Sequence, residues 1–476
     1  MKLNQFYLIL ITTLVASLLA SCGGGGGGGG GSGSGNTNNS NDPLPDIEPS
    51  TPIDSSVWSE ASPESVGMDS TIISAAFDEA FVDGTYTQAA LVIKDSKLVY
   101  ERYRGIEANE KTTLVSSYSD TWDNGFDSET VQAQFGTRDK DSLATSWSTA
   151  KSFTSVLIAI AIEQDYIESL DQSAADFINE WGGDQRADIT IRNLLDMRSG
   201  LHMICRNSPT SQLDECNGTE RADGDLLYFD NQLEPCINRQ LATTGVYQPW
   251  YWGATFEEGD WLYSNCDSMV LGEILFRATG QSLENYADIN LFSKIGMEAS
   301  WWQDNDPTGQ VDGNYLSYCC IDATPRDFAK FGQLLLNNGV WDGEQIIPQS
   351  YIDNIKSIAI DSTAYGEVSY GLQFWTVGPQ IQADGSTFPL ANTVYSTIGY
   401  DGQYIMIDFD NNMLVLRNSL YQPVLNRSND RKYKTTNEAA TSNFVSTLPS
   451  FTVVGTSTTF NNTNLLYQVT QSITSQ

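Results

Sequence analysis

Residues 148–164 form the segment that most restricts what this chain can fold into. It carries charge only at Lys151 and Glu163, and its larger apolar side chains follow helical spacing at Phe153, Val156, Leu157, Ile160 and Ile162. A helix this apolar is stable only when most of its surface is buried. We therefore expect a central helix inside a large domain, with Lys151 withdrawn from water.

Two residues at the start of this helix can carry chemistry. Ser148 and Lys151 stand three positions apart, which places both side chains on one face of a helix within hydrogen-bonding reach. A serine hydroxyl becomes a nucleophile when a base removes its proton, and burial favours the neutral amine of a lysine. Free N–H groups at a helix N-terminus favour a developing anion. We interpret Ser148 as a nucleophile and Lys151 as its base.

The chain contains one histidine, His202, the residue type that most often serves as such a base. It directly follows Ser199-Gly200-Leu201, and no Gly-x-Ser-x-Gly nucleophile elbow accompanies it. We expect His202 to be a loop or pocket-lining residue. A single histidine and the lack of a Cys-x-x-Cys motif also argue against a zinc site.

A second polar group, Tyr263-Ser264-Asn265, precedes another apolar helix. The Tyr263 hydroxyl can relay protons between nucleophile, lysine and leaving group, and the Asn265 amide can hold both the lysine and the substrate. The structural alternative is a tyrosine at the end of a strand, followed by a helix N-cap.

The N-terminus is typical of an exported protein. Residues 1–21 match a signal peptide, because Lys2 precedes an apolar run too short to span a membrane comfortably. The run ends in Leu19-Ala20-Ser21-Cys22, which resembles a lipoprotein processing site with Cys22 as the lipidated residue. Since Gly23 follows, the resemblance favours lipid anchoring in the outer membrane. The alternative is an ordinary signal peptide.

The remaining chain divides by composition. Residues 22–57, rich in Gly, Ser and Asn, are expected to be a flexible tether. Residues 58–447 are long enough for one large domain, and 448–476 are expected to be a polar, peripheral tail. The net charge of −35 argues against a nucleic-acid partner and against adsorption to anionic lipid. The sequence leaves the oligomeric state open.

Cysteines are expected to form disulfides, because an even number remains in an exported chain once Cys22 is set aside. The sequence does not choose among the pairings of these six residues, which are Cys205, Cys216, Cys236, Cys266, Cys319 and Cys320.

The order of expected elements indicates an α+β fold. Helices are expected over 66–83, from 188 to Gly200, and over 265–280, 282–290, 325–338, 348–356 and 436–446. Strands are expected at 90–94 and 98–103, joined by a turn at Asp95-Ser96, and at 392–398, 403–409 and 413–418. Both chain ends therefore supply strands: an α/β lobe made of about 58–150 and 340–447 would carry an inserted helical lobe of about 151–339.

Ser148-x-x-Lys151 followed by Tyr263-x-Asn265 resembles the β-lactamase-related serine hydrolases. This superfamily includes penicillin-binding proteins, class C β-lactamases, family VIII esterases and 6-aminohexanoate-dimer hydrolase. The resemblance runs in order from about 60 to 447. Further stretches that carry it are Ser146-Trp-Ser-Thr-Ala-Lys-Ser-Phe-Thr-Ser, Ile189-Thr-Ile-Arg-Asn-Leu-Leu, Ser199-Gly-Leu, Leu291-Phe-Ser-Lys-Ile-Gly-Met, Ala323-Thr-Pro-Arg-Asp-Phe-Ala-Lys-Phe-Gly, Gly339-Val-Trp-Asp-Gly and Tyr370-Gly-Leu-Gln-Phe-Trp.

The resemblance implies a β-lactamase/transpeptidase-like fold, an antiparallel sheet flanked by helices. The wording around Ser148 is nearest to the 6-aminohexanoate-dimer hydrolase and family VIII esterase branch. One motif departs from the penicillin-recognising members, which carry Lys-Thr-Gly on the strand lining the site. Lys434-Thr435-Thr436 lies after the last expected strand, where we expect a surface loop.

The corresponding place here reads Gly399-Tyr400-Asp401-Gly402-Gln403. We expect the backbone N–H groups of Ser148 and of Gln403 to form the oxyanion hole, and Tyr400, Gly402 and Trp375 to line the substrate site. The missing lysine removes a partner for the carboxylate of a β-lactam.

Three functions remain open. The first is a hydrolase of small amides or esters that uses Ser148, Lys151 and Tyr263 and needs no metal or organic cofactor. The second is a D-Ala-D-Ala carboxypeptidase or β-lactamase, against which the missing Lys-Thr-Gly argues. The third is a non-catalytic surface binding protein with the same fold.

Overall fold

The computed structural model describes most of the chain after residue 57. The described residues are 58–118, 128–202, 226, 231–245, 247–248, 254–255, 257–304, 313–358, 361–363, 366–368, 370–377, 380–381, 387–388, 394–420, 431–433, 442–444 and 460–474. The predicted signal peptide, Cys22 and the tether lie outside these residues, as do Cys205, Cys216 and Lys434-Thr435-Thr436.

A hairpin opens the main sheet. Strands β1 (Thr87–Lys94) and β2 (Lys97–Tyr103) are joined at Asp95 and Ser96, whose φ angles of 51° and 60° fit the tight turn predicted there. Successive side chains of β1 face opposite sides of the sheet, so Leu91 and Ile93 enter one hydrophobic core while Ala90 and Val92 enter the other.

Strands from the far end of the sequence continue this sheet. β16 (Val394–Gly399), β17 (Gln403–Asp408) and β18 (Met413–Ser419) are antiparallel, and β18 pairs with β1 in the register Leu91↔Leu416. The seven strands follow the order β12-β13-β16-β17-β18-β1-β2, in which β12 is Tyr370–Gly371 and β13 is Phe374–Val377. The three strands expected at 392–398, 403–409 and 413–418 are confirmed.

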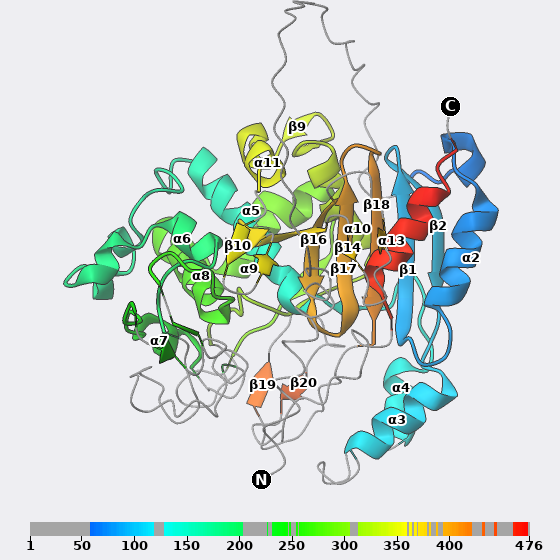
Figure 1. Cartoon of the computed structure of the whole chain (residues 1–476), viewed down its shortest axis with the longest axis horizontal. Coiled ribbons are helices and arrows are strands. Elements are labelled where there is room, and N and C mark those ends of the chain that lie inside the picture. Colours follow the sequence, from blue (N-terminus) through cyan, green and yellow to red (C-terminus); the bar gives the residue numbers. More distant parts are fainter. Residues whose placement is uncertain are drawn as a thin grey trace, which may run out of the picture.

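Two helices from opposite ends of the sequence cover one face of the sheet (Figure 1). They are α2 (Ser70–Ala80) and α13 (Asn462–Gln471). Leu465, Leu466 and Val469 of α13 are buried in the same core as Phe77 of α2. The predicted peripheral tail is therefore wrong for residues 462–471, because these apolar side chains complete the outer layer of the sheet.

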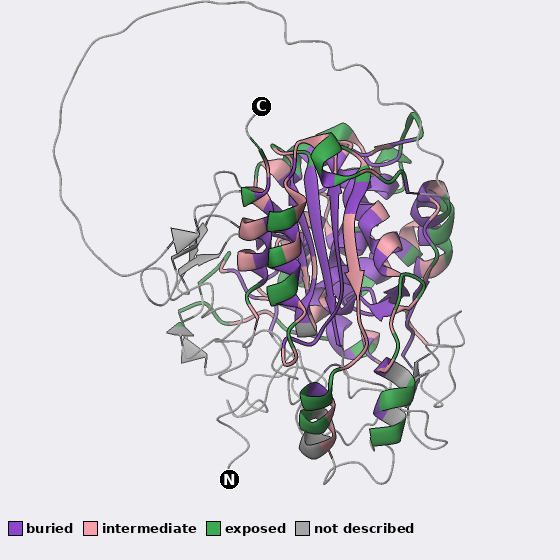
Figure 2. Ribbon diagram, turned by 90° about the vertical axis from the view of Figure 1, so that its right-hand side faces the viewer, coloured by how far each residue is buried: buried purple, intermediate pink, exposed green. Residues whose placement is uncertain are grey.

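Long helices cover the opposite face. α5 (Ala150–Glu163) is buried along nearly all of its length, as predicted, and α8 (Asn265–Thr279) and α10 (Pro325–Leu336) pack into the same core. Caps fix their starts: Ser264 accepts the N–H of Asp267, and Thr324 accepts the N–H of Asp327. Figure 2 shows the buried sheet enclosed between the layers.

The other described elements surround these layers or connect them. The helices and single turns are η1 (Pro63–Val66), α3 (Ala108–Tyr118), α4 (Ser128–Phe135), η2 (Trp147–Thr149), η3 (Ala174–Asp176), η4 (Asn179–Trp181), η5 (Gln185–Asp188), α6 (Ile191–Leu195), α7 (Leu233–Ile237), α9 (Leu283–Ala287), the π-helical turn η7 (Asp288–Phe292), η8 (Ser293–Ile295), α11 (Gln349–Lys356) and η9 (Tyr400–Gly402). The strands are β3 (Ala144–Thr145), β4 (Tyr247–Gln248), β5 (Ala254–Thr255), β6 (Ala299–Trp301), β7 (Ile321–Ala323), β8 (Val340–Trp341), β9 (Glu344–Gln345), β10 (Asp361–Thr363), β11 (Gly366–Val368), β14 (Gln380–Ile381), β15 (Thr387–Phe388), β19 (Arg431–Tyr433) and β20 (Ser442–Phe444).

Three predicted helices differ from the structure. Residues 66–83 contain α2 only from Ser70, because Gly67 is left-handed at φ 73° and Asp69 caps the helix. The helix after 188 ends at Leu195 rather than Gly200, since Met197 has a φ of 57°. The helix predicted over 436–446 is wrong at 442–444, which form β20 and pair with β19.

Two disulfides settle part of the cysteine pairing. Cys236 is bonded to Cys266, and Cys319 is bonded to its chain neighbour Cys320. Within the described residues, no helix is both long and apolar enough to cross a membrane.

Candidate active site

Ser148 lies in the single turn η2, directly before α5. The turn is held from both sides of its backbone: Ser146 N–H donates to the Ile321 carbonyl at 2.8 Å, and Ile321 N–H donates to Ser146 Oγ at 2.8 Å. Trp147, which precedes Ser148, adopts a positive φ of 45° that non-glycine residues seldom occupy. Ser148 is half-buried in this fixed turn.

Lys151 is 1% exposed, so its amine is withdrawn from water as the sequence predicted. Its Nζ lies 3.1 Å from Ser148 Oγ, 2.7 Å from Asn265 Oδ1 and 2.9 Å from the Tyr318 carbonyl oxygen. The predicted pair of Ser148 and Lys151 is therefore in hydrogen-bonding contact, and Asn265 holds the lysine.

The three oxygen neighbours of Lys151 Nζ accommodate an ammonium, which donates to all three, and also a neutral amine, which donates to two of them. A neutral Nζ has two N–H groups and one lone pair, whereas the ammonium has three N–H groups and no lone pair. Asn265 Oδ1 and the Tyr318 carbonyl can only accept, so they take the two N–H groups. The lone pair then faces the third neighbour, Ser148 Oγ, and can accept its proton.

Tyr263 comes from the segment that enters α8, and Ser264 caps that helix. Lys151 Nζ lies 4.9 Å from the centroid of the Tyr263 ring, so the structure brings the third predicted residue beside the lysine. The helix-cap interpretation is also correct, because Ser264 of the same segment caps α8 while its two neighbours lie beside Lys151. Tyr263 and Asn265 stand on either side of the capping residue.

The end of β16 packs directly on the turn of Ser148. A Cβ added at Gly399 would lie 2.1 Å from the Ser146 carbonyl, so a larger residue would displace the strand from the turn. Thr149 Oγ1 lies 3.2 Å from Thr397 Oγ1 and donates to the Gln403 carbonyl at 3.3 Å. Gln403 is thus beside the residue that follows Ser148.

The side chain of Gln403 points away from the turn. Its Nε2 donates to the Ser419 carbonyl at 2.9 Å, and its Oε1 accepts from Asn418 Nδ2 at 2.9 Å. With the side chain held on β18, only the backbone of Gln403 is left to serve a substrate. This fits the predicted use of its N–H, which stays a prediction.

Aromatic residues flank both sides of the pair. Tyr400 packs edge-on against Trp147 with ring centroids 5.8 Å apart, and Trp375 lies 5.7 Å from the Tyr263 ring. Trp375 is mostly buried, in a cluster with Met197, Trp261 and Tyr370. Tyr400 and Trp375 therefore both adjoin the candidate site, one through the residue before Ser148 and the other through Tyr263.

Gly402 meets a constraint that the sequence did not reveal. Its φ is 86°, and an added Cβ would lie 2.3 Å from Nη1 of Arg417. The guanidinium of Arg417 is fully buried and donates to Thr87 Oγ1, the Thr85 carbonyl and Asn462 Oδ1. Gly402 thus lies between the candidate site and the Arg417 guanidinium. Its predicted role in lining the substrate site stays a prediction.

Two other contributors were missed by sequence reasoning. The Tyr318 carbonyl gives no signal, because any residue supplies a backbone oxygen. Arg239 and Asp267 form a fully buried ion pair at 2.8 Å, and Arg239 also donates to Ser264 Oγ at 3.0 Å. Together with the Cys236–Cys266 bond, this pair fixes the segment that carries Tyr263 and Asn265.

His202 is buried on the loop that follows Gly200. Burial and the nearby Arg239 guanidinium lower the pKa of His202 to about 4, so the ring is neutral at ordinary pH. Its backbone N–H donates to the Gln240 carbonyl at 2.8 Å. A neutral imidazole is also the form that can accept a proton, so the expectation that His202 is a loop or pocket-lining residue stays a prediction.

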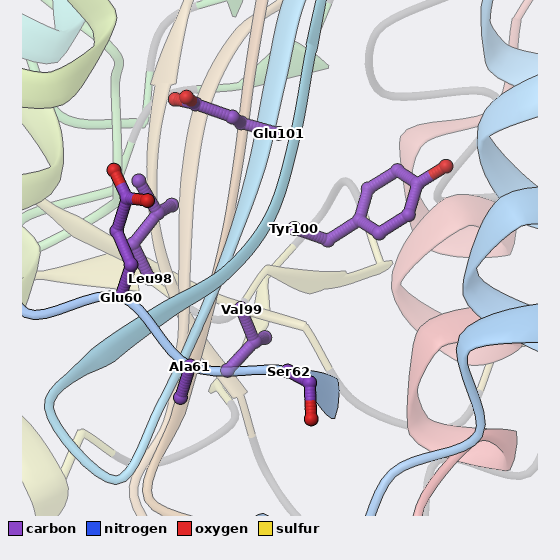
Figure 3. Close-up of a pocket in the computed structure, with 7 residues that line it drawn as sticks. All are labelled: Glu60, Ala61, Ser62, Leu98, Val99, Tyr100 and Glu101. Atoms are coloured by element: carbon purple, nitrogen blue, oxygen red, sulfur yellow. The ribbon is translucent and has the colours of Figure 1, made fainter. Parts of the chain in front are cut away.

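A groove of about 390 Å³ lies at the β2 edge of the sheet, lined by Glu60, Ala61, Ser62, Leu98, Val99, Tyr100 and Glu101 (Figure 3). The Tyr100 ring turns toward α2, where it packs on Phe77, and Glu101 turns to the opposite side and pairs with Arg326. The groove contains none of the predicted site residues. We assign it no part in the chemistry.

Comparisons with known proteins give one consistent result. A family model described as Beta-lactamase matches residues 76–433. The 6-aminohexanoate-dimer hydrolase of Paenarthrobacter ureafaciens is 22% identical over 310 residues, covering 63% of this chain and 67% of the relative.

Two solved structures from other bacteria are similar to this chain, and the first of them supports the fold. A Bacteroides dorei protein provisionally titled a beta-lactamase superposes with a TM-score of 0.51 at 14% identity, covering 86% of this chain and all of its own. A class C beta-lactamase from Rhodobacter sphaeroides has a TM-score of 0.46 at 15% identity, covering 74% of this chain and 95% of its own.

Proposed function

This chain belongs to the beta-lactamase family of serine hydrolases, and we propose that it cleaves a small amide or ester through an acyl-enzyme on Ser148. The expected β-lactamase/transpeptidase-like fold is confirmed. The observation that carries the proposal is the position of Lys151 Nζ, 3.1 Å from Ser148 Oγ and held by Asn265 and Tyr318.

The reaction begins with transfer of the Ser148 proton to neutral Lys151 while Oγ attacks the substrate carbonyl carbon. The resulting oxyanion is stabilised by the backbone N–H groups of Ser148 and Gln403. Tyr263 delivers a proton to the leaving amine or alcohol as the carbon–heteroatom bond breaks, and Lys151 passes the proton it took from Ser148 back to Tyr263. Water then attacks the Ser148 ester and gives its proton to Lys151 and Tyr263. These groups return the proton to Ser148 Oγ as the acid is released.

The substrate is proposed to be a linear amide or a short acyl ester. The named activity of the Paenarthrobacter ureafaciens relative is hydrolysis of 6-aminohexanoate dimer, a linear amide. The segment Gly399 to Gln403 has no lysine to pair with a β-lactam carboxylate, which argues against the carboxypeptidase or β-lactamase alternative. The contacts of Lys151 with Ser148 and Asn265 argue against a protein that only binds.

The test compares wild type with Ser148→Ala and with Ser65→Ala, a control serine exposed on η1. Each is assayed on p-nitrophenyl esters, 6-aminohexanoate linear dimer and nitrocefin, and each is exposed to a fluorophosphonate probe. We expect wild type and Ser65→Ala to be labelled and to hydrolyse the first two substrate classes, and Ser148→Ala to do neither. Rapid turnover of nitrocefin would favour the β-lactamase alternative.

We also propose that the protein is exported and lipid-anchored at Cys22, and that Gly23 directs it to the outer membrane. Support comes from the signal-peptide pattern that ends in Leu19-Ala20-Ser21-Cys22. Metabolic labelling with a clickable fatty acid in a bacterial host should mark wild type but not Cys22→Ala. Equal labelling of both proteins would contradict lipidation at this residue.

A further inference from the structure

Cys319 and Cys320 form a disulfide between chain neighbours. Both residues are 1% exposed, and their Cα atoms are 3.7 Å apart. Cys320 has a φ of 70°, a left-handed conformation that costs a non-glycine residue about 1 kcal/mol or more. The bond between the two sulfurs closes a small ring that includes the peptide between the residues, so this peptide has little freedom while the bond exists.

One side of the ring contacts the turn that carries the nucleophile. Cys320 N–H donates to the Trp147 carbonyl at 3.3 Å, and Trp147 is the residue before Ser148. The next residue, Ile321, exchanges backbone and side-chain hydrogen bonds with Ser146, each 2.8 Å long. The ring and its C-terminal neighbour thus support Ser148 from the backbone side.

The other side of the ring contacts the base. Tyr318, which directly precedes Cys319, accepts a hydrogen bond from Lys151 Nζ through its carbonyl at 2.9 Å. The Tyr318 hydroxyl donates to Gln232 Oε1 at 2.7 Å, and the Cys319 carbonyl accepts from Trp301 Nε1 at 3.1 Å. A short, constrained segment therefore positions both the nucleophile turn and one of the two acceptors that orient the lysine.

We propose that the Cys319–Cys320 disulfide is a redox-sensitive positioning element that holds Ser148 and Lys151 in their reactive arrangement. This inference rests on the proposed function of Ser148. Its reductant is a dithiol: one thiolate attacks a cysteine sulfur, which breaks the S–S bond and forms a mixed disulfide. The second thiolate of the reagent then attacks this mixed disulfide and releases the cysteine as a thiolate. The protein gains two electrons and two protons as two thiols, and the reagent leaves as a disulfide.

Opening the ring frees the peptide between Cys319 and Cys320 to leave the left-handed conformation. The Tyr318 carbonyl and the Cys320 N–H then lose their fixed places against Lys151 and Trp147. Because a carbonyl acceptor favours the protonated amine, its loss moves the rising limb of the pH–rate profile to lower pH. The poorer orientation of the lysine lowers kcat by about tenfold or more, with a smaller change in KM.

The experiment uses the full chain, purified without reductant and then treated with dithiothreitol. Alkylation followed by mass spectrometry reports when residues 319 and 320 are reduced, and kcat, KM and the pH profile are measured on a p-nitrophenyl ester before and after. Cys319→Ser/Cys320→Ser should resemble the reduced wild type and should not respond to dithiothreitol. Cys236→Ser/Cys266→Ser lacks the other described disulfide, which supports the segment of Tyr263 and Asn265, so its own untreated rate is the reference; relative to that rate it should respond to dithiothreitol as wild type does.

A second variant separates the ring from the backbone conformation. In Cys319→Ser/Cys320→Gly the glycine adopts a positive φ without strain, so the peptide can keep its place without the S–S bond. We expect this variant to regain part of the kcat that the double serine variant loses. The same variant keeps the proposal testable when the serine variant fails to fold.

Free thiols at both positions in the untreated protein would overturn the proposal, as would a kcat and pH profile unchanged by complete reduction. Ser148→Ala is measured in parallel. When Ser148→Ala retains turnover, the proposed function has failed. When Ser148→Ala is inactive but oxidised and reduced wild type behave alike, only the redox proposal has failed.

Discussion

Asn265 Oδ1 lies 2.7 Å from Lys151 Nζ, although the two residues are 114 positions apart. Asn265 is the first residue of α8 and Lys151 is the second of α5, so the packing of these two helices brings the amide to the amine. The base is therefore oriented by the tertiary structure and not by its own helix alone.

Asn265→Asp should change the pH dependence of turnover. A carboxylate at this distance stabilises the protonated form of Lys151, and only the neutral amine can accept the Ser148 proton. The rising limb of kcat/KM against pH should therefore move to higher pH. Asn265→Ala, which removes the acceptor, should lower kcat/KM by about 10²-fold. A profile of Asn265→Asp that coincides with wild type would show that Asn265 does not act on the lysine.

Gly402→Ala and Gly343→Ala form a matched pair. Their φ angles are 86° and 80°, but an added Cβ contacts Arg417 at 2.3 Å in the first and has nothing within 4 Å in the second. Gly343→Ala should cost about 1 kcal/mol of unfolding free energy. Gly402→Ala should cost about 1–3 kcal/mol more from overpacking, and should also reduce turnover. Urea unfolding measures the stability of the two variants, and ester hydrolysis measures their turnover. Equal losses of unfolding free energy in Gly402→Ala and Gly343→Ala would contradict the close contact with Arg417.

Arg239→Met should destabilise the protein by about 3–5 kcal/mol, because it leaves Asp267 buried without its cation. The double change Arg239→Met/Asp267→Leu removes both charges and should recover much of that loss. The midpoint of urea unfolding gives the comparison. A single variant as stable as wild type would show that the pair is not desolvated in solution.

Asp322 should make stability depend on pH. Burial raises the pKa of this carboxyl to about 7 in the folded protein from an ordinary value of 3.8, while Trp302 Nε1 donates to it at 2.8 Å. The folded protein binds the Asp322 proton more tightly than the unfolded chain does, so protonation of Asp322 contributes its full stabilisation below pH 3.8. That stabilisation is lost as the pH rises to about 7.

Asp322→Asn keeps an acceptor for Trp302 and removes the titration. Wild type should lose stability relative to this variant between pH 4 and 7, by at most about 4 kcal/mol at the pKa shift cited above. Denaturant midpoints measured across this range provide the check. Parallel curves for the two proteins would show that the carboxyl does not titrate there.

His202→Gln should leave ester turnover within about threefold of wild type, since we expect a loop or pocket-lining residue here and assign the role of base to Lys151. The folded-state pKa of about 4 lies below the ordinary value of 6.5, so the neutral ring favours folding above pH 6.5. That contribution is lost as pH falls toward 4. Acid unfolding should therefore begin at lower pH in the glutamine variant. A loss of turnover comparable with that of Ser148→Ala would restore histidine as a candidate base.

The sequence was most informative where chemistry follows local spacing. Ser148 and Lys151 share one helical turn, so their contact follows from helix geometry. Tyr263-Ser264-Asn265 combines a helix cap with two side chains that lie beside Lys151. The Tyr318 carbonyl could not be predicted in this way, because its position depends on the loop that contains Cys319 and Cys320. The Gly402–Arg417 contact is likewise set by the pairing of β17 with β18.

The missed C-terminal helix did have a signal. Leu465, Leu466 and Val469 follow helical spacing, and Asn461 before them is a common N-cap residue, here accepting the N–H of Asn464. The polar composition of the tail concealed this amphipathic stretch. The composition of a segment averages the polarity of all faces of a helix, whereas the packing of the helix on the sheet depends on the one face that is apolar.

The sheet joins residues from opposite ends of the sequence, as in the contact of Ser419 Oγ with the Tyr86 carbonyl across 333 positions. A ribosome therefore releases β1 and β2 long before their partner β18 exists. Until β18 is made, the hairpin exposes an edge that can pair with strands of other molecules. The large separation in sequence between paired strands makes assembly of the sheet slow and leaves the hairpin open to aggregation in the meantime.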